Sequence, residues 1–241
     1  MKKIARWTIG KTNVLGEESL KLSLRRFRVI YPEFETIICC NNLTHEQRLR
    51  LNCLGCQIHD QSSEELNYPL VSIDAPIGEK NSMPGWGWKL LPPRLHMQSY
   101  ELWIDNDVIV RERMPSIDKW ICSDRSIVSL AHKKAYGVFD QEIPGNTPYC
   151  AGFFGLPPDF DFNSRILHYC KKLNGNPLGY YDEQGVTVSC LLEANPIVIP
   201  ENELSVIKCL KKPYPNAMHF IGINRTENHK IWSDYKCYTL M

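Results

Sequence analysis

Residues 101–110 read Glu-Leu-Trp-Ile-Asp-Asn-Asp-Val-Ile-Val, an apolar and β-branched run that carries two aspartates in its middle. Apolar residues on both sides of Asp105 and Asp107 indicate a strand buried on both faces, as in the central parallel sheet of an α/β domain. A buried charge is costly unless it is paired or binds a cation. In an undisturbed strand both aspartates would point to one face. Their hard oxygens suit Mg²⁺ or Mn²⁺, so the run predicts a cation site and a substrate that carries a diphosphate.

The alternative is that the two aspartates belong to an ordinary surface turn. Trp103 and Ile104 precede them, and Val108, Ile109 and Val110 follow. Such large apolar flanks argue against a solvated turn and favour the metal interpretation.

Composition narrows the class of protein. The chain has 241 residues and a formal net charge of +1, from 28 Lys and Arg against 27 Asp and Glu. That balance gives no support for a nucleic-acid partner, which usually requires a basic excess. No apolar run approaches the roughly 18 residues of a membrane span, and the first residues lack the apolar core of a secretory signal. We therefore expect a cytoplasmic protein without a transmembrane segment, whose ten cysteines are mostly free thiols.

Alternating strand and helix patterns predict the fold class. Strands are expected at 2–9, 36–40 and 56–59, with helices at 17–30 and from Thr44 to about residue 54. This β-α-β-α-β beginning predicts a doubly wound, mainly parallel sheet flanked by helices, and we expect residues 1–241 to form a single domain. Later elements are expected as a short helix near 88–98 that Pro92-Pro93 interrupts, a strand at 126–131, helices at 160–172 and 183–194, and a strand at 196–199.

Ligands of such sheets bind beyond the carboxyl ends of the strands. The acidic motif lies at one such end. The first strand belongs to the same sheet, so we expect its carboxyl end to lie close to the motif in space. The residues expected to flank a bound nucleotide at these two ends are Thr8, Ile9, Gly10 and Asn106.

At this point the chain resembles a family. Its Ile-Asp-Asn-Asp-Val-Ile-Val segment is similar to the D-x-D motif of GT-A fold glycosyltransferases, which use nucleotide-sugar donors. Trp88-Lys89 lies where retaining members of that family often carry a basic residue that contacts the donor. Residues 149–155, Tyr-Cys-Ala-Gly-Phe-Phe-Gly, resemble the small-residue segment that lines the sugar pocket, which implicates Ala151 and Gly152.

Two later segments extend the resemblance. Residues 181–184, Tyr-Asp-Glu-Gln, resemble the acidic motif that opens a helix beside the transferred sugar. Residues 219–225 are similar to the His-x-x-Gly-x-x-Lys closing motif of the glycogenin and galactosyltransferase-like group. That likeness implies that His219 is a third metal ligand and that Gly222 and Arg225 lie at the diphosphate. Arg225 stands where Lys is usual, which keeps the charge and changes the geometry.

The resemblance implies a GT-A-like, Rossmann-like α/β domain that transfers a sugar from a nucleotide-diphosphate sugar with Mn²⁺ or Mg²⁺. The donor implied is a UDP-sugar, and the closing motif implies a retaining reaction. The acceptor is unidentified and could be a glycan, a lipid or a protein. The catalytic candidates are Asp182 and Glu183, as acceptors of hydrogen bonds from sugar hydroxyls, and Gln184, near the anomeric carbon.

Each assignment has a plainer alternative. Asp182 and Glu183 would also suit the first turn of a helix, where acidic residues are favourable. Lys89 could be an ordinary surface lysine, and His219 could be a core histidine. The basic side of the helix expected at 17–30 could contact anionic lipid peripherally, although a solvated face is the commoner explanation.

Two other classes of protein compete with a glycosyltransferase. One is a nucleotidyl- or phosphoryl-transferring α/β enzyme that uses the same metal pair. The other is a non-catalytic module that binds sugar nucleotides. The intact set of Asp105, Asp107 and His219 argues against the non-catalytic module.

Overall fold

A computed structural model describes residues 1–10, 12–41, 43–61, 87–174, 181–207, 213–221 and 232–235. Its first half contains β1 (Lys3–Ile9), α1 (Val14–Ile30), β2 (Glu35–Cys40), α2 (His45–Asn52), β3 (Gln57–Asp60), the 3₁₀ turn η2 (Gly87–Leu90), β4 (Tyr100–Ile104), β5 (Val108–Val110) and α3 (Pro115–Trp120). Its second half contains β6 (Ile127–Leu130), η3 (Gly137–Phe139), β7 (Tyr149–Leu156), α4 (Phe162–Cys170), η4 (Lys171–Leu173), α5 (Asp182–Leu192), β8 (Ile197–Val198), β9 (Leu204–Val206) and β10 (Ala217–His219).

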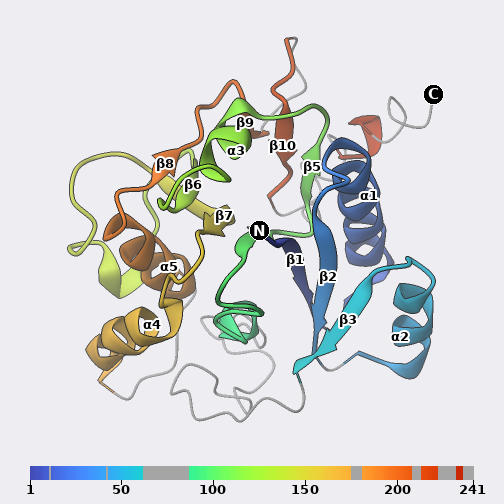
Figure 1. Ribbon diagram of the computed structural model, residues 1–241, viewed down its shortest axis with the longest axis horizontal. Coiled ribbons are helices and arrows are strands. Elements are labelled where there is room, and N and C mark those ends of the chain that lie inside the picture. The colour runs from blue at the N-terminus through green and yellow to red at the C-terminus, as the bar shows by residue number, and fades with distance from the viewer. Residues whose placement is uncertain are drawn as a thin grey trace.

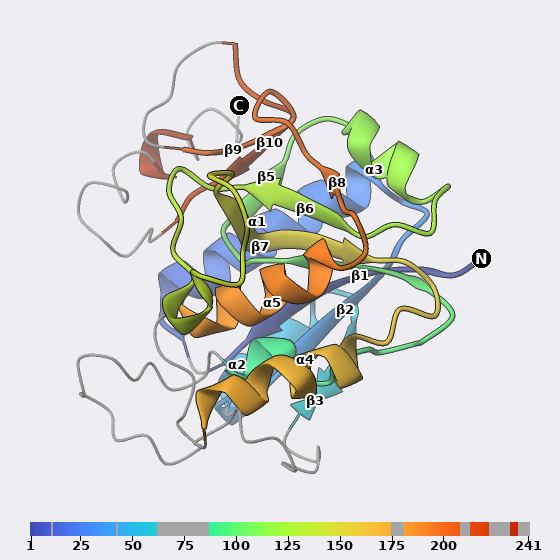
Figure 2. The same cartoon turned by 90° about the vertical axis from the view of Figure 1, so that its left-hand side faces the viewer.

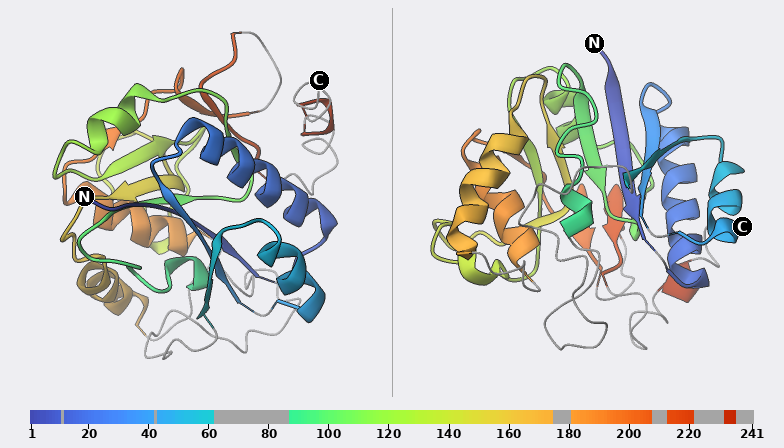
Figure 3. Two further views of the ribbon diagram at one scale, coloured as in Figure 1. Left: turned by 45° about the vertical axis from the view of Figure 1, so that its right-hand side comes forward. Right: turned by 90° about the horizontal axis from the view of Figure 1, so that it is seen from below.

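The main sheet has seven strands in the order β3-β2-β1-β4-β7-β6-β8. Neighbouring strands run parallel except where β7 pairs antiparallel with β4 and β6. In the right-hand view of Figure 3, α1 and α2 lie on one side of the strands, and α4 and α5 lie on the other. The predicted α/β class, with a mainly parallel sheet between helices, is confirmed (Figure 1).

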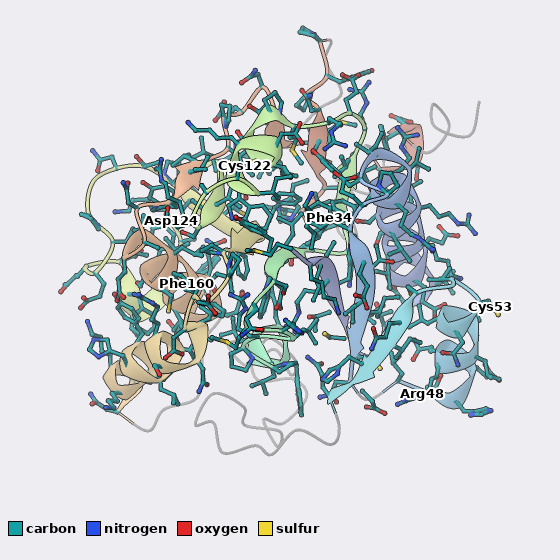
Figure 4. The ribbon with its side chains drawn as sticks, in the orientation of Figure 1. Phe34, Arg48, Cys53, Cys122, Asp124 and Phe160 are labelled. Carbon is teal, nitrogen blue, oxygen red and sulfur yellow. The ribbon has the colours of Figure 1, made fainter. Side chains whose placement is uncertain are left out.

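Alternate residues of β4 join two different cores, as the period of a pleated strand requires. Leu102 and Ile104 of β4 join the core under α1, whereas Trp103 joins the core under α4 and α5. Figure 4 labels one member of each core, Phe34 and Phe160, on the two sides of the strands. All of β4 and β5 is buried, so the prediction of strands buried on both faces is confirmed for these segments.

The local signals for α2 are confirmed. Thr44 caps the helix: its hydroxyl accepts a hydrogen bond from the Gln47 backbone N–H at 3.2 Å, and the Gln47 side-chain oxygen accepts one from the Thr44 N–H at 3.2 Å. This reciprocal capping box satisfies two donors that the helix itself leaves unpaired.

The acidic run departs from the expected continuous strand. β4 ends at Ile104, the chain turns through residues 105–107, and β5 continues into a different sheet of three strands in the order β5-β10-β9. Figure 2 shows these three strands side by side. The condition for a shared face, an undisturbed strand, is therefore not met, and the two aspartates lie in a turn at the carboxyl end of β4. The turn is closed by the Val108 N–H, which donates to the Asp105 carbonyl at 3.0 Å.

The helix expected near 88–98 is reduced to the single turn η2. Prolines 92 and 93 end it, since proline lacks the N–H that a helix needs and disfavours helical geometry in the residue before it. Buried side chains hold this segment instead. Arg6 donates to the carbonyls of Leu91 at 2.6 Å and Pro92 at 2.7 Å, and Gln61 donates to the carbonyls of Trp88 and Leu91.

Two further expectations can be compared with the described residues. None of the described helices combines the length and the apolar character that a membrane crossing needs. The cysteines of the described ranges are free thiols, and Cys53 lies exposed at the end of α2 (Figure 4).

Candidate metal centre

Asp105, Asp107 and His219 converge at the carboxyl end of β4. One donor atom from each lies within 4.8 Å of the others. The closest approach to the imidazole is 3.2 Å, from His219 Nε2 to Asp107 Oδ1, and Asp105 Oδ2 lies 3.8 Å from the same nitrogen. The two carboxylates are partly exposed, whereas the imidazole is buried. The predicted metal ligands are thus neighbours in space.

The small sheet explains how residues so distant in sequence meet. β10 pairs antiparallel with β5, which places His219 opposite Val108. The next residue continues the contact, because the Phe220 N–H donates to the Asp107 carbonyl at 2.9 Å. The pairing of β10 with β5 therefore places His219 next to the turn at residues 105–107.

The imidazole of His219 is enclosed on several sides. Cys150 Sγ lies 3.8 Å from its Nδ1, on the other side of the ring from Asp107. Gly152 packs against the ring so closely that a Cβ added there would lie 2.2 Å from His219 Cε1. Burial alone would lower the pKa of His219, but the facing carboxylate of Asp107 outweighs burial and raises this pKa well above its usual value.

Lys89 is not an ordinary surface lysine. Its ammonium lies 2.8 Å from Asp105 Oδ1 and 3.4 Å from Glu183 Oε1, and it donates a hydrogen bond to the Ala151 carbonyl at 2.9 Å. Burial opposes the charge on Lys89, yet the carboxylates of Asp105 and Glu183 overcome this effect and raise its pKa above the ordinary value. A cationic group therefore lies beside the candidate metal centre.

Glu183 is the member of the 182–184 segment that faces this centre. It lies in the first turn of α5 and is buried. Its Oε1 atom forms no hydrogen bond within the part of the chain that is described, and its charged neighbour is the ammonium of Lys89. Burial raises the pKa of Glu183, and the lysine opposes that shift. A buried carboxylate with an oxygen free of hydrogen bonds can accept one from a ligand.

The other two members of that segment are engaged elsewhere. Asp182 accepts a hydrogen bond from the Val138 N–H at 2.9 Å and supports the turn η3, where Gly137 has a φ of 59°. Gln184 joins the loop before η3 to the start of β7: its amide nitrogen donates to the Ala135 carbonyl at 2.9 Å, and its oxygen accepts from the Ala151 N–H at 3.4 Å. Both side chains hold the framework around the centre.

The residues expected beside a nucleotide are brought together in part. Asn106 donates to the Thr8 carbonyl at 3.1 Å, which joins the acidic turn to the end of β1, and Asn106 Oδ1 is buried with no partner among the described residues. Ile9 is buried and Gly10 is exposed at that same strand end. Ala151 and Gly152 lie on β7 beside Lys89 and His219. Gly222 and Arg225 lie outside the described residues.

The donor set fits a small divalent cation. Around one Mg²⁺ or Mn²⁺ each ligand atom sits about 2.1 Å from the ion, so the ligand atoms lie within roughly 4.2 Å of one another. The observed spread of 4.8 Å needs only a small closure of exposed carboxylates. Carboxylates suit Mg²⁺ and Mn²⁺, and an imidazole nitrogen adds a ligand that transition metals accept readily.

Sequence reasoning missed two features of this region. The sequence indicated Cys150 only as part of the small-residue segment at 149–155, and no local pattern pairs it with His219. The buried ion pair between Arg6 and Glu101, at 3.2 Å, was also missed, although a charge inside each apolar strand marks it. Arg6 stacks on Trp103 at 3.8 Å and anchors the segment that carries Lys89.

Comparison with known proteins locates the fold. No protein-family model matches the chain, and no curated protein sequence matches it. Among solved structures, the chain is similar to the galactosyltransferase LgtC in complex with donor and acceptor sugar analogues, with a TM-score of 0.58 and 11% identity over 90% of this chain and 87% of that one. It is also similar to the apo form of the glycosyltransferase GlyE of Streptococcus pneumoniae, with a TM-score of 0.59 and 11% identity over 100% of this chain and 61% of that one.

A third similar structure is the bifunctional glycosyltransferase WbbM, with a TM-score of 0.56 and 9% identity over 92% of this chain and 46% of that one. The described elements therefore form a GT-A fold, as the resemblance implied. At these identities the likeness is one of fold, and the chemistry has to be argued from the residues of the site.

Proposed function

We propose that this protein is a glycosyltransferase that moves a sugar from a nucleotide-diphosphate sugar, a UDP-sugar by our preference, to an acceptor hydroxyl. One observation carries the proposal: two carboxylates and an imidazole converge within 4.8 Å at the carboxyl end of β4, beside a half-buried lysine and a buried glutamate. The similar fold of LgtC, a galactosyltransferase solved with donor and acceptor sugar analogues, adds support.

In this reaction the bond between the anomeric carbon and the diphosphate oxygen breaks, and its electron pair leaves with the nucleoside diphosphate. The acceptor oxygen bonds to the anomeric carbon, and its proton passes to the departing diphosphate. A divalent cation, Mn²⁺ or Mg²⁺, held by Asp105, Asp107 and His219 would neutralise the charge that develops on the diphosphate. Lys89 adds a second positive group on the same side, which further favours departure of the diphosphate.

Glu183 is the residue we assign to the transferred sugar. It is buried, its Oε1 lies 3.4 Å from Lys89 Nζ, and it is on the same side of the site as Asp105. A carboxylate there can accept hydrogen bonds from sugar hydroxyls and can stabilise positive character at the anomeric carbon. Asp182 and Gln184 then position the helix start rather than contact the sugar. The likeness of the segment that follows His219 to the closing motif supports retention of configuration.

Nucleotide sugars and their products provide the test. In Mn²⁺, a UDP-sugar at about 100 times its dissociation constant should stabilise the native state by about 2.7 kcal/mol and raise the melting temperature by roughly 5–10 °C. No such shift is expected with excess chelator or in Asp107→Asn. Glu183→Gln should retain the shift and lose most turnover.

Product analysis separates this reaction from its competitors. Transfer or slow donor hydrolysis should release UDP, because the bond at the anomeric carbon breaks. Release of UMP and a sugar 1-phosphate would instead identify cleavage at phosphorus and contradict the proposal. A thermal shift without any turnover, tested with glycan, lipid and peptide acceptors, would favour a binding module.

A further inference from the structure

Cys150 and Asp107 face the two nitrogens of one imidazole. Cys150 Sγ lies 3.8 Å from His219 Nδ1, and Asp107 Oδ1 lies 3.2 Å from His219 Nε2. Cys150 is 2% exposed and His219 is also 2% exposed, so water does not readily replace either contact. The ring is therefore held between a sulfur atom and a carboxylate.

Metal binding through Nε2 fixes what the opposite nitrogen must do. A nitrogen that ligates a cation uses its lone pair, so in the neutral ring the proton has to be on Nδ1. A buried N–H needs an acceptor, and an unmet donor destabilises the state that contains it. Within the described residues, the partner found at Nδ1 is the sulfur of Cys150.

The position of that sulfur is itself fixed by β7. The Gly152 backbone N–H donates to Cys150 Sγ at 3.4 Å, which helps to hold the sulfur in place. Gly152 also contacts the edge of the imidazole, where an added Cβ would lie 2.9 Å from His219 Nδ1. Cys150 and Gly152 of β7 thus provide the hydrogen-bond partner of Nδ1 and the surface against which the imidazole packs.

We propose that Cys150 is a positioning residue of the metal centre, whose sulfur accepts the Nδ1 hydrogen of His219 and thereby presents Nε2 to the cation. This inference rests on the cation site of the proposed function. Partners that orient a ligating histidine in this way commonly change metal affinity 10- to 100-fold when they are removed.

The test is direct Mn²⁺ binding to the full chain, measured from the free-ion electron paramagnetic resonance signal without any nucleotide. Cys150→Ala should bind Mn²⁺ about 10- to 100-fold more weakly than the wild type. Cys150→Ser keeps an acceptor atom of shorter reach, so its Mn²⁺ affinity should lie between those of the wild type and Cys150→Ala. This variant provides the test if the alanine variant does not fold. Cys170→Ala is the matched control, since it removes a buried thiol from the apolar core beside α4, and it should bind Mn²⁺ as the wild type does.

A second readout reports on the hydrogen bond itself. In Mg²⁺-saturated wild-type protein, the His219 Nδ1 proton should give a protected resonance at the shift of a hydrogen-bonded imidazole. In Cys150→Ala that resonance should move and exchange faster with solvent. A change in fold stability alone would leave it in place in the folded fraction.

Two outcomes would overturn the inference, and they differ from each other. Wild-type binding of Mn²⁺ combined with equal affinity in Cys150→Ala and an unmoved Nδ1 resonance would remove the role of Cys150 and leave the metal centre intact. Absence of Mn²⁺ binding by the wild-type protein would remove the metal centre, and with it the mechanism proposed above.

Discussion

The ammonium of Lys89 lies 2.8 Å from Oδ1 of Asp105, while Oδ2 of the same aspartate faces His219 Nε2 at 3.8 Å. One carboxylate therefore serves two neighbours, with a different oxygen toward each. The same lysine also lies 3.4 Å from Glu183. In metal-free protein, Lys89 is therefore a counter-charge that Asp105 and Glu183 share.

Lys89→Met should destabilise the metal-free protein by roughly 1–3 kcal/mol, because two partly buried carboxylates lose their shared counter-charge. Mn²⁺ should reduce the difference in unfolding free energy between Lys89→Met and the wild type, since a cation at Asp105 replaces part of the lost charge. Urea unfolding in chelator and in Mn²⁺ measures both values. Lys172→Met, at an exposed pair with Glu142, is the control and should change stability by less than about 1 kcal/mol. Equal losses for the two variants would contradict this role.

Two glycines of β7 provide a matched pair of substitutions. A Cβ at Gly152 would lie 2.2 Å from His219 Cε1 and 2.9 Å from Asp105 Oδ2, whereas one at Gly155 would lie 2.5 Å from Trp120 in the core. Gly152→Ala should therefore weaken Mn²⁺ binding at least tenfold. Gly155→Ala should destabilise the fold by about 1–3 kcal/mol and leave Mn²⁺ affinity unchanged in the folded protein. Calorimetry with Mn²⁺ and urea unfolding separate the two effects; a reversed pattern would refute the assignment.

The buried pair between Arg6 and Glu101 should contribute strongly to stability. Arg6→Met leaves Glu101 with Arg94, at 3.4 Å, and the Leu95 N–H, at 2.9 Å. It also removes one donor from each of the carbonyls of Leu91 and Pro92. A loss of about 3–5 kcal/mol is expected, as for other broken buried pairs. The exposed pair between Arg48 and Asp60 is the control, and Arg48→Met should cost less than about 1 kcal/mol. Similar urea midpoints for the two variants would show that the buried pair is not a major contributor.

Stability should fall in acid partly through Glu17. Two hydrogen bonds from Arg50, at 2.7 and 2.8 Å, lower the pKa of Glu17 below its ordinary value of 4.5, and burial opposes them only in part. The stabilisation is complete above pH 4.5, where the unfolded chain is also ionised, and is lost as the pH falls through the lower pKa of the folded state. Glu17→Gln should flatten the dependence of unfolding free energy on pH below 4.5, while the profile above pH 6 keeps its shape. An unchanged slope would refute the linkage.

Local signals predicted the first half of the fold well. The strand and helix periods from β1 to β3, and the capping box at Thr44, depend on residues a few positions apart, so they can be read from the sequence alone. The short helix expected near 88–98, with its interruption at Pro92-Pro93, is a single turn in the structure. The prolines end this turn, and buried donors from Arg6 and Gln61 replace helical hydrogen bonds, which no local pattern shows.

The site was predictable only in part, because its geometry depends on pairing between distant segments. The charge anomaly at Asp105 and Asp107 identified the correct strand end but not the turn that carries them. The antiparallel pairing of β10 with β5 is invisible to local patterns, so His219 entered through the family resemblance alone. The same charge argument, applied to Arg6 and Glu101, would have identified the buried pair as well.

The short pairing between β5 and β10 has a consequence for how the chain behaves as a polymer. A cation bound to Asp107 and His219 would tie together two points separated by nearly half of the sequence, in the manner of a reversible cross-link. Local opening of β10 would break that link before the main sheet is disturbed. Amide exchange of Met218 and His219 should then slow on metal addition, while exchange within β1 and β2 stays constant. The bound cation would thus stabilise β10 against local opening.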